Sequence, residues 1–254
     1  MPHSVHSTPP QARTPDTNCN IEEPIPLGQK YWNNNLPEHL WTETCPEFLI
    51  GISSKNVGIL SGREENWHNF SWEDCKLLVT SNTIDKFQRP PLALRRYIRY
   101  MYGLRQHYGS VMTFIQKERL GWRSLEPTST VPFVDPSDYK ILYNDWPYGI
   151  DGVVVHLVVW VKFDLPNDPD TGEVKPEYAS LVTEFINRTF CSDFGVQDGV
   201  PEDDVLWFKN WDNLKSVKAL EHFHVMLREA SQEFLNRITN NDRPMAELVA
   251  EMPM

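Results

Sequence analysis

Two histidines, His222 and His224, stand two positions apart among apolar residues in the stretch "SVKALEHFHVML" at residues 216–227. In a β-strand both side chains would leave the same face, because strand residues alternate between faces. His156, within the apolar run "VVVHLVVW", could then approach them from a neighbouring strand. Three converging imidazoles could exchange protons near neutral pH or bind a divalent ion such as zinc, and each could also be a hydrogen-bonded core residue. The sequence leaves these three interpretations open.

A second group of polar residues lies in "YNDWPYGIDG", where Asp145 and Tyr148 follow one expected strand and precede the next. Loops at the ends of strands often carry binding residues, so both side chains are candidates for ligand contacts. The alternative is structural, because an Asp in such a turn can accept hydrogen bonds from nearby backbone amides. Both interpretations fit the spacing.

Basic residues are concentrated between residues 86 and 123, where nine Lys and Arg accompany a single acid, Glu118, although the whole chain has a formal charge of −11. Tyrosines are interleaved with them, so the segment could hold phosphates while aromatic rings pack or stack. The alternative is a solvated helix face whose charge is neutralised by the acidic remainder of the chain. A phosphate-bearing partner is therefore a working hypothesis.

The elements that must position these residues change in kind along the chain. Helical patterns come first: Ser71, with Asp74 three residues later, opens one helix, and two further helices meet near Gly109. Period-two or apolar runs follow in "YKILYND", "VVVHLVVWVKF" and "DVLWFKN", with an amphipathic helix at "PEYASLVTEFINRTF". We predict an α+β fold with N-terminal helices followed by a small mixed β-sheet with packed helices.

The stretch that carries the two histidines fits two kinds of element. Residues 216–241 contain no Gly or Pro, so one long helix is compatible with them. At 222–227, however, Phe223, Val225 and Leu227 alternate with two histidines and a methionine, which is the pattern of a strand. We therefore favour a strand at 222–227 followed by a helix.

The composition sets the limits of the folded part. Residues 1–30 are rich in Pro, Ser, Thr, Gln and Asn and are expected to be a disordered tail, whereas residues 31–254 are expected to form a single catalytic domain. No apolar run is long enough to span a bilayer and no signal peptide is recognisable, so we expect a cytoplasmic protein. The four scattered cysteines are expected to be reduced thiols.

The turn and the histidines together resemble the histidine-triad nucleotide-binding proteins, which share this order of turn, strand His and His-x-His. The matching pieces are residues 144–147, His156, Ser216, His222 and His224. The first triad position is Leu220, so the match is incomplete. This resemblance implies that His222 is a nucleophile on an α-phosphate.

A longer resemblance covers roughly residues 40–240. The motifs "YGSV…ERLGW", "NDWPYG", "HLVVW" and "EHFHVML" are similar to those of the fungal N-acetylglucosamine-induced protein family. One branch of that family is similar to the fungal arginine-containing cyclodipeptide synthases, which join arginine and a second amino acid from aminoacyl-tRNAs into a diketopiperazine. A tRNA partner would account for the basic segment, so we favour the synthase branch.

That resemblance implies aminoacyl transfer without a metal, a nucleoside triphosphate or another cofactor, because an aminoacyl ester is already activated. His222 and His224, with His156 beside them, are the expected proton-transfer residues, since an unperturbed imidazole titrates near neutral pH. Ser216 or Ser110 would carry an acyl group if the reaction were ping-pong.

Recognition of such substrates requires charges of both signs. A carboxylate would pair with the arginine guanidinium, and the acids beside the motifs are Asp145, Asp151 and Glu221, with Tyr148 close to them. The residues expected to contact tRNA are Arg89, Arg95, Arg96, Arg99, Arg105, Lys117 and Arg119. The expected partners are Arg-tRNA and a second aminoacyl-tRNA, with neither DNA nor a membrane.

Two other functions remain open. A histidine-triad-like nucleotide hydrolase or transferase would use His222 as its nucleophile and would bind a mononucleotide. A non-enzymatic regulator of amino-sugar metabolism would keep the histidines as core residues.

Overall fold

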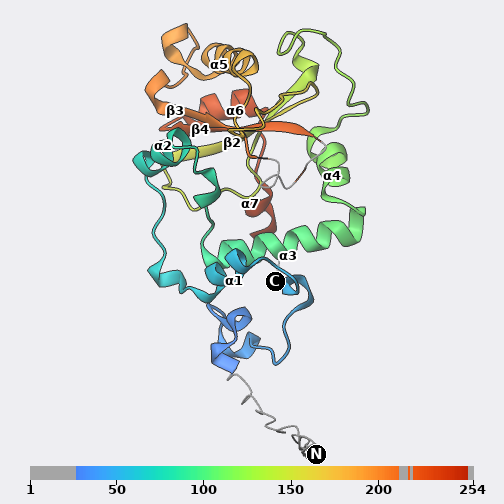
Figure 1. Cartoon of the computed structure of the whole chain (residues 1–254), viewed down its shortest axis with the longest axis vertical. Coiled ribbons are helices and arrows are strands. Elements are labelled where there is room, and N and C mark those ends of the chain that lie inside the picture. The colour runs from blue at the N-terminus through green and yellow to red at the C-terminus, as the bar shows by residue number, and fades with distance from the viewer. Residues whose placement is uncertain (1–26, 212–216, 218–219, 251–254) are drawn as a thin grey trace, which may run out of the picture.

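The computed structural model describes residues 27–211, 217 and 220–250, and within them four strands form one sheet (Figure 1). The strands, in sheet order, are β1 (Tyr139–Tyr143), β2 (Val154–Val161), β4 (Glu221–Arg228) and β3 (Val205–Phe208). All three pairings are antiparallel. The predicted α+β class and the strand at 222–227 are confirmed, and the sheet is antiparallel rather than mixed.

The two apolar runs of the sequence form the centre of the sheet. β2 and β4 pair over eight residues, from Val154 opposite Arg228 to Val161 opposite Glu221. β-Branched and aromatic residues dominate β2, and residues 156–161 are buried. Such residues fit a pleated surface covered on both sides, which is why this pair is central and the shorter β1 and β3 form the edges.

Helices cover both faces of the sheet. They are α1 (Ser54–Ser61), α2 (Trp72–Thr80), α3 (Pro91–Tyr108), α4 (Val111–Phe114), α5 (Pro176–Phe190), α6 (Gln232–Thr239) and α7 (Met245–Ala250), with a π-helical turn at Ile115–Leu120 after α4. Figure 1 shows α5 and α6 on one side of the sheet and α2, α3, α4 and α7 on the other, with α1 beyond α3. The sheet is therefore the middle layer of the molecule.

Local sequence signals determine where α2, α3 and α4 begin or end. Ser71 and Asp74 form a capping box at the start of α2, as predicted. Pro91 occupies the first turn of α3, and Gly109, with φ of +75°, ends that helix at the predicted junction. The Ser110 side chain then accepts a hydrogen bond from the backbone N–H of Thr113 and starts α4.

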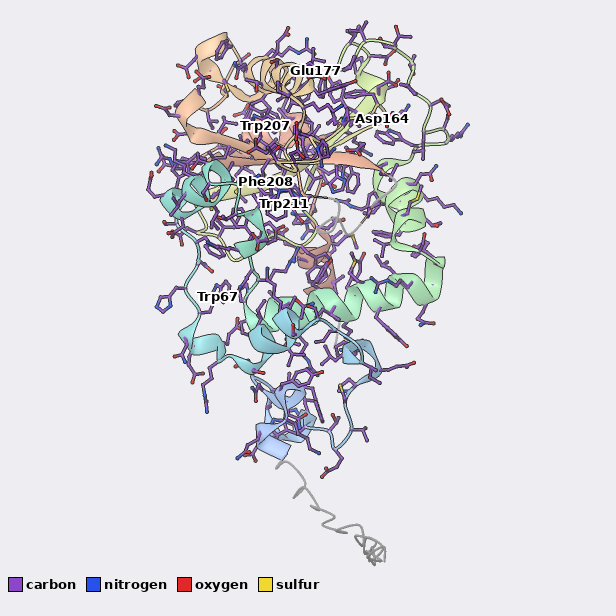
Figure 2. The ribbon with its side chains drawn as sticks, viewed as in Figure 1. Trp67, Asp164, Glu177, Trp207, Phe208 and Trp211 are labelled. Atoms are coloured by element: carbon purple, nitrogen blue, oxygen red, sulfur yellow. The ribbon has the colours of Figure 1, made fainter. Side chains whose placement is uncertain are left out.

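Alternation along the strands gives the sheet two different faces. Phe223, Val225 and Leu227 enter a large apolar cluster with α5 and α6, whereas His222 and His224 project from the opposite face. Figure 2 shows the same division on β3, where the consecutive residues Trp207 and Phe208 lie on opposite sides of the sheet. Trp207 contacts the Phe223 ring and Phe208 stacks on the His224 ring, with centroids 6.2 and 4.9 Å apart.

The N-terminal part begins earlier than the composition suggests. The predicted tail at residues 1–30 lies outside the described residues up to position 26, but Leu27–Gln29 form a short 3-10 turn. Lys30 then forms an ion pair of 2.9 Å with Glu43 and lies over the Trp32 ring. Ordered structure therefore starts before Tyr31, the residue at which we expected it.

Two further expectations concern the redox state of the cysteines and the absence of a membrane span. Cys45, Cys75 and Cys191 are free thiols, and Cys19 lies outside the described residues. Burial raises the pKa of the Cys75 thiol to about 12 and that of Cys191 to about 11, so both are protonated near neutral pH. Within the part of the chain that the structure describes, no helix combines the length and the apolar character that a membrane span requires.

Candidate functional site

A cavity of about 360 Å³ separates the histidine-bearing face of the sheet from the helices below it. Its walls come from β1, β2 and β4, from α3 and α4, and from the turns at residues 84–89 and 144–148. His222, His224 and Asn210 line it from the sheet side, together with aromatic residues of α3 and of the 144–148 turn. The cavity is thus an aromatic chamber with a few polar groups, the usual composition of a small-molecule site.

Strand register brings two of the predicted histidines together. His156 of β2 pairs with Met226, and His224 of β4 pairs with Val158, so the two rings are diagonal neighbours on one face. His156 Nε2 lies 2.9 Å from His224 Nδ1, and both side chains are buried. The predicted approach of a third histidine from the neighbouring strand is confirmed for this pair.

Two asparagines extend the pair into a buried polar chain. The Asn210 Nδ2 atom donates to His224 Nε2 at 2.9 Å, which leaves the His224 proton on Nδ1, facing His156. At the other end, Asn144 Nδ2 lies 3.2 Å from His156 Nε2, and Asn144 Oδ1 accepts from the Trp146 backbone N–H. Asn210, His224 and His156 therefore form one hydrogen-bonded chain, and the Asn144 amide lies against its end.

Burial makes the histidine pair electrically neutral. Desolvation, followed by the charge of Arg89, lowers the pKa of His156 to about 3. Desolvation also holds the pKa of His224 well below its ordinary value, with His156, His222 and Arg89 acting in the same direction. We expected near-neutral imidazoles that pick up protons, and for these two residues that expectation is wrong, because their environment excludes the charged form.

His222 has a different environment from the pair. Its Nδ1 atom lies 2.8 Å from the Leu220 carbonyl oxygen, so Nδ1 carries the proton and Nε2 holds the lone pair in the neutral ring. The Trp160 ring packs against the imidazole with centroids 4.5 Å apart. The ring is thus fixed in orientation and tautomer at the cavity wall, which is what a general base or a nucleophile requires.

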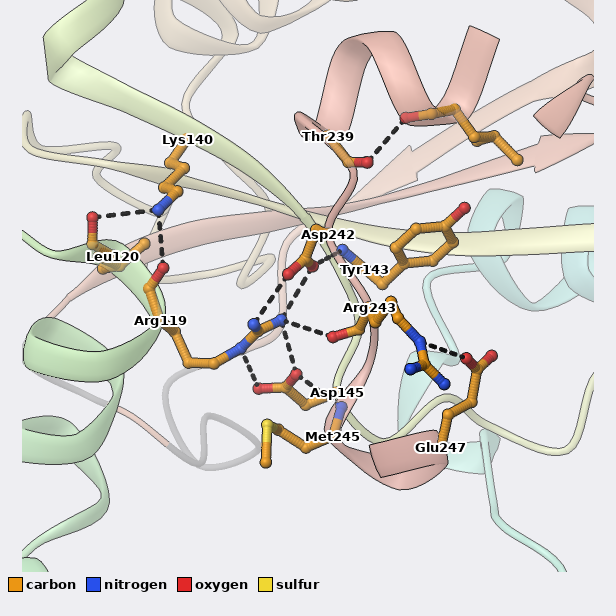
Figure 3. Close-up of polar contacts among 11 residues, drawn as sticks. Arg119, Leu120, Lys140, Tyr143, Asp145, Thr239, Asp242, Arg243, Met245 and Glu247 are labelled. Atoms are coloured by element: carbon orange, nitrogen blue, oxygen red, sulfur yellow. Dashed lines mark hydrogen bonds and ion pairs between the residues drawn. The ribbon is translucent and has the colours of Figure 1, made fainter. Parts of the chain in front are cut away.

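Asp145 lines the cavity, but its charge is already paired. Arg119 donates to Asp145 Oδ2 through Nε at 3.0 Å and contacts Oδ1 through an Nη atom at 2.9 Å. The same guanidinium forms two hydrogen bonds, of 2.8 and 2.9 Å, to the carboxylate of Asp242 (Figure 3). An internal arginine thus occupies the carboxylate that we predicted to bind a substrate guanidinium.

The same ion network attaches the C-terminal segment to the site (Figure 3). Asp242 accepts the backbone N–H of Tyr143 at 3.0 Å, at the end of β1. The backbone N–H of Met245 donates to Asp145 Oδ1 at 3.1 Å, and that of Ala246 donates to the Asp145 carbonyl oxygen at 2.9 Å. We call residues 242–246 the C-terminal clamp, because they hold the turn that forms one wall of the cavity.

Tyr148 lies in the cavity wall as predicted, within a stack of rings. Its ring is parallel to Phe87 at 4.9 Å, and the Arg89 guanidinium lies between Tyr148 and Tyr97, 5.1 and 4.3 Å from the two centroids. Arg89 also donates to the Trp146 carbonyl oxygen. Desolvation raises the pKa of Tyr148, so its hydroxyl stays protonated at neutral pH.

Three other predicted residues do not line the cavity, and a fourth cannot be placed in it. Glu221 forms an ion pair of 2.8 Å with Lys209, and its place in β4 puts it on the face opposite the histidines. Asp151 does not line the cavity, and its backbone pairs with Phe70 and Val154. The Ser110 hydroxyl caps α4, and Ser216 lies outside the described residues.

The predicted tRNA-contacting residues divide into two groups. Arg89, Arg95 and Arg119 form hydrogen bonds within the protein, whereas the other four are exposed. Arg95 donates to the Trp32 carbonyl oxygen and lies over the Phe48 ring, which attaches α3 to the N-terminal layer. The exposed members, available to a polyanion, are Arg96, Arg99, Arg105 and Lys117.

Several cavity residues were not recognised in the sequence. Asn210 follows β3 by two positions and continues the alternation of Phe208, so strand parity could have placed it beside His224. Trp146, Tyr97 and Trp160 gave no signal beyond their apolar character. Within the described ranges no cluster of three or more His, Cys, Asp or Glu residues is suited to a metal ion.

Comparisons with known proteins place the chain among fungal relatives. The model of a family described as "Protein of unknown function (DUF3605)" matches residues 71–228, more than half of the chain. N-acetylglucosamine-induced protein 1 of Candida albicans is 25% identical over 193 residues, which are 68% of this chain and 74% of that protein. The uncharacterized protein YPL067C of Saccharomyces cerevisiae is 25% identical over 173 residues, 66% of this chain and 84% of that protein.

One solved structure shares the fold. A chain described as "Crystal Structure of HTC1" superposes with a TM-score of 0.53 at 22% sequence identity, over 69% of this chain and 98% of that chain. This likeness supports the α+β architecture.

Proposed function

The chain belongs to the DUF3605 family of proteins of unknown function, and from this premise and the geometry of the cavity we propose that it is a tRNA-dependent cyclodipeptide synthase. It would join arginine, taken from Arg-tRNA, to a second amino acid from another aminoacyl-tRNA. The observation that carries the proposal is His222, a buried imidazole in the wall of the cavity, whose Nδ1–H donates to the Leu220 carbonyl so that the neutral ring carries its lone pair on Nε2.

The chemistry needs a base and an activated carbonyl. The α-amine nitrogen of one aminoacyl group forms a bond to the ester carbonyl carbon of the other, and the bond from that carbon to the ribose oxygen breaks. His222 Nε2 accepts the amine proton and returns it to the departing oxygen. A second attack of the same kind, by the remaining amine on the remaining ester, closes the six-membered ring and releases the second tRNA.

The neutral histidine pair supports this step indirectly. His156 and His224 add no positive charge beside His222, because burial excludes their charged forms. A cation there would lower the basicity of His222 and repel a protonated amine. We assign the pair the role of positioning residues, and His222 that of the catalytic base.

Recognition of the arginine side chain must use groups other than Asp145. The aromatic walls accept a guanidinium already, as Arg89 between Tyr97 and Tyr148 demonstrates. Asp85 is the other acidic side chain among the described residues of the wall, and it is exposed. A substrate guanidinium could therefore stack on the rings and pair with Asp85.

The outer surface of α3 supports a polyanionic partner. Arg96 and Arg99 are exposed on the helix whose inner side, through Tyr97 and Tyr100, lines the cavity. A tRNA bound on that surface would contact the helix that forms one wall of the cavity. This arrangement supports tRNA delivery to the cavity and has no use in a free-amino-acid enzyme.

The test is to express the whole chain in a bacterial host, which supplies every aminoacyl-tRNA, and to analyse the medium by mass spectrometry. We expect an arginine-containing diketopiperazine that is absent with the His222→Asn variant, since Asn can still donate to the Leu220 carbonyl but is no base. His107→Asn, at the exposed end of α3, is the matched control. Soluble protein without any such product in the medium would refute the proposal.

The tautomer of His222 also favours a second candidate, a nucleotide hydrolase or transferase. Nε2 could attack an α-phosphate as well as accept a proton, and Arg89 is a cation in the cavity wall. Incubation of the purified chain with adenosine and guanosine nucleotides decides between the two. Turnover that depends on His222, without any diketopiperazine, would favour this candidate, and no reaction in either assay would favour a binding or regulatory protein.

A further inference from the structure

Two buried polar atoms in the cavity wall have no hydrogen-bond partner among the described residues. They are the indole Nε1 of Trp146, a donor, and the side-chain Oδ1 of Asn210, an acceptor. Both residues are 6% exposed. An unpaired buried polar group is costly and uncommon in native proteins, so two of them in the wall of one cavity call for a physical explanation.

The surroundings of the two atoms define what could satisfy them. The nearby histidines are neutral, and the carboxylate of Asp145 is neutralised by Arg119. The Arg89 guanidinium is directed at the backbone carbonyl of Trp146. The two atoms therefore favour a neutral group of the ligand, with one donor and one acceptor, next to the aromatic rings of the wall.

We propose that Trp146 and Asn210 are the polar contacts that hold the ligand of this cavity: the indole N–H donates to a ligand carbonyl oxygen, and the Asn210 carbonyl accepts a ligand N–H. The chemical class is a neutral amide that presents both an N–H and a C=O, as in a diketopiperazine ring. An aminoacyl group, with its amine and its ester carbonyl, presents the same pair. The choice of ligand rests on the proposed function, whereas the two contacts rest on the cavity alone.

Contacts with neighbouring side chains fix the orientation of both Trp146 and Asn210. Trp146 packs against Tyr97 and Tyr100, with centroids 6.0 and 5.3 Å apart, so its indole is oriented before a ligand arrives. Asn210 is fixed by its Nδ2 hydrogen bond to His224, which leaves Oδ1 as the atom for the ligand. Contacts made by oriented groups lose little entropy on binding.

The chain contains a matched control for Trp146. Trp72 is also buried with an unpartnered indole N–H, but it packs in the cluster beneath α2 and does not line the cavity. Replacing either tryptophan by Phe removes one unpaired donor and keeps an aromatic ring. A purely structural effect should therefore be similar in the two variants, whereas a ligand contact is lost only with Trp146.

The experiment uses nitrogen-15-labelled full-length protein and the probe cyclo(Gly-Gly), and it needs no catalysis. The sequence has 9 tryptophans, and the indole resonance of Trp146 is the one that disappears in Trp146→Phe. We expect the probe to move the Trp146 indole proton downfield and to leave that of Trp72 in place. Trp146→Phe should weaken binding about fivefold, and Trp72→Phe should not change Kd.

A second probe tests Asn210 without changing the protein. The N,N′-dimethylated ring keeps both carbonyl groups but carries a methyl group in place of each N–H hydrogen, so it should bind the wild-type chain at least about fivefold more weakly and still respond to Trp146→Phe. An absence of saturable binding, or binding that leaves the Trp146 indole unmoved and Kd unchanged in Trp146→Phe, would overturn the inference. Probe binding without synthesis in the bacterial host would uphold these contacts and reject the synthase. Synthesis in the bacterial host without probe binding would support the synthase and reject these contacts.

Discussion

The two faces of the central sheet have different chemistry, although they are built from the same strands. On one face Phe223, Val225 and Leu227 close against α5 and α6 in a dry apolar cluster. On the other, His222 and His224 border a cavity with polar groups held in fixed orientations. Alternate residues of β4 therefore face either the apolar core or the cavity. Substitutions at adjacent positions can then be compared for their effects on stability and on activity.

The largest expected effect is on the dry face. Phe223 is completely buried and contacts the rings of Phe133, Phe185 and Trp207, so Phe223→Ala should lower the free energy of unfolding by about 3–5 kcal/mol. Urea unfolding followed by circular dichroism measures it. A loss below about 1 kcal/mol would show that this face is not the stabilising one.

The adjacent residue should show the opposite behaviour. His222→Asn keeps a donor for the Leu220 carbonyl but removes the base, so turnover should fall roughly 10²-fold or more with little change in unfolding midpoint. Product formation by the purified chain with aminoacyl-tRNAs is the assay, and His107→Asn is the control. Full turnover together with a large loss of stability would make His222 a core residue.

The polar face should also make stability depend on pH. His156 and His224 have folded-state pKa values lowered from 6.5, to about 3 for His156, so their contribution is fully present above pH 6.5 and is lost as pH falls toward 3. Between pH 7 and 5.5 we expect a loss of about 2 kcal/mol from the pair. Urea unfolding at the two pH values measures it.

A double variant isolates this contribution from the other titrating groups. Replacing both partners, as His156→Leu with His224→Leu, removes the buried imidazoles without leaving one of them unpaired. The pH dependence of unfolding over this range should then flatten. An unchanged slope would mean that other groups cause the acid sensitivity.

The smallest expected effect lies farthest from the sheet. Arg96→Glu with Arg99→Glu reverses two exposed charges on the outer side of α3 and should weaken tRNA binding roughly tenfold at moderate salt. Arg63→Glu with Arg237→Glu makes the same change in net charge elsewhere and is the matched control. Equal losses in the two variants would indicate a general charge effect and no docking surface on α3.

Short-range patterns in the sequence were sufficient for the elements. The alternation at 222–227 predicted the strand, its two faces and the convergence of His156 with His224, because strand geometry follows from local spacing. Ser71 and Asp74 predicted the start of α2 in the same way. Each of these inferences used residues whose relation is fixed within one element or one strand pair.

Long-range pairing was not accessible in this way. Arg119 looked like one more member of a basic segment, but its partners are Asp145 and Asp242, the latter 123 positions away. Arg95 likewise binds the Trp32 carbonyl across 63 positions. A count of charges therefore overestimated the basic surface, and the low pKa values of His156 and His224 depend on a burial that composition alone does not reveal.

The C-terminal clamp affects how the protein folds during translation. The cavity wall at Asp145 is complete only when Asp242 has joined Arg119 and the backbone of Met245 has reached the Asp145 carboxylate. These contacts join Arg119 and Asp145 to residues 123 and 100 positions later in the sequence, so a nascent chain can form its helices and early strands before this wall is complete. The site therefore matures late in translation, once Asp242 and Met245 have been added, and a chain truncated before Asp242 would lack the contacts that hold this wall.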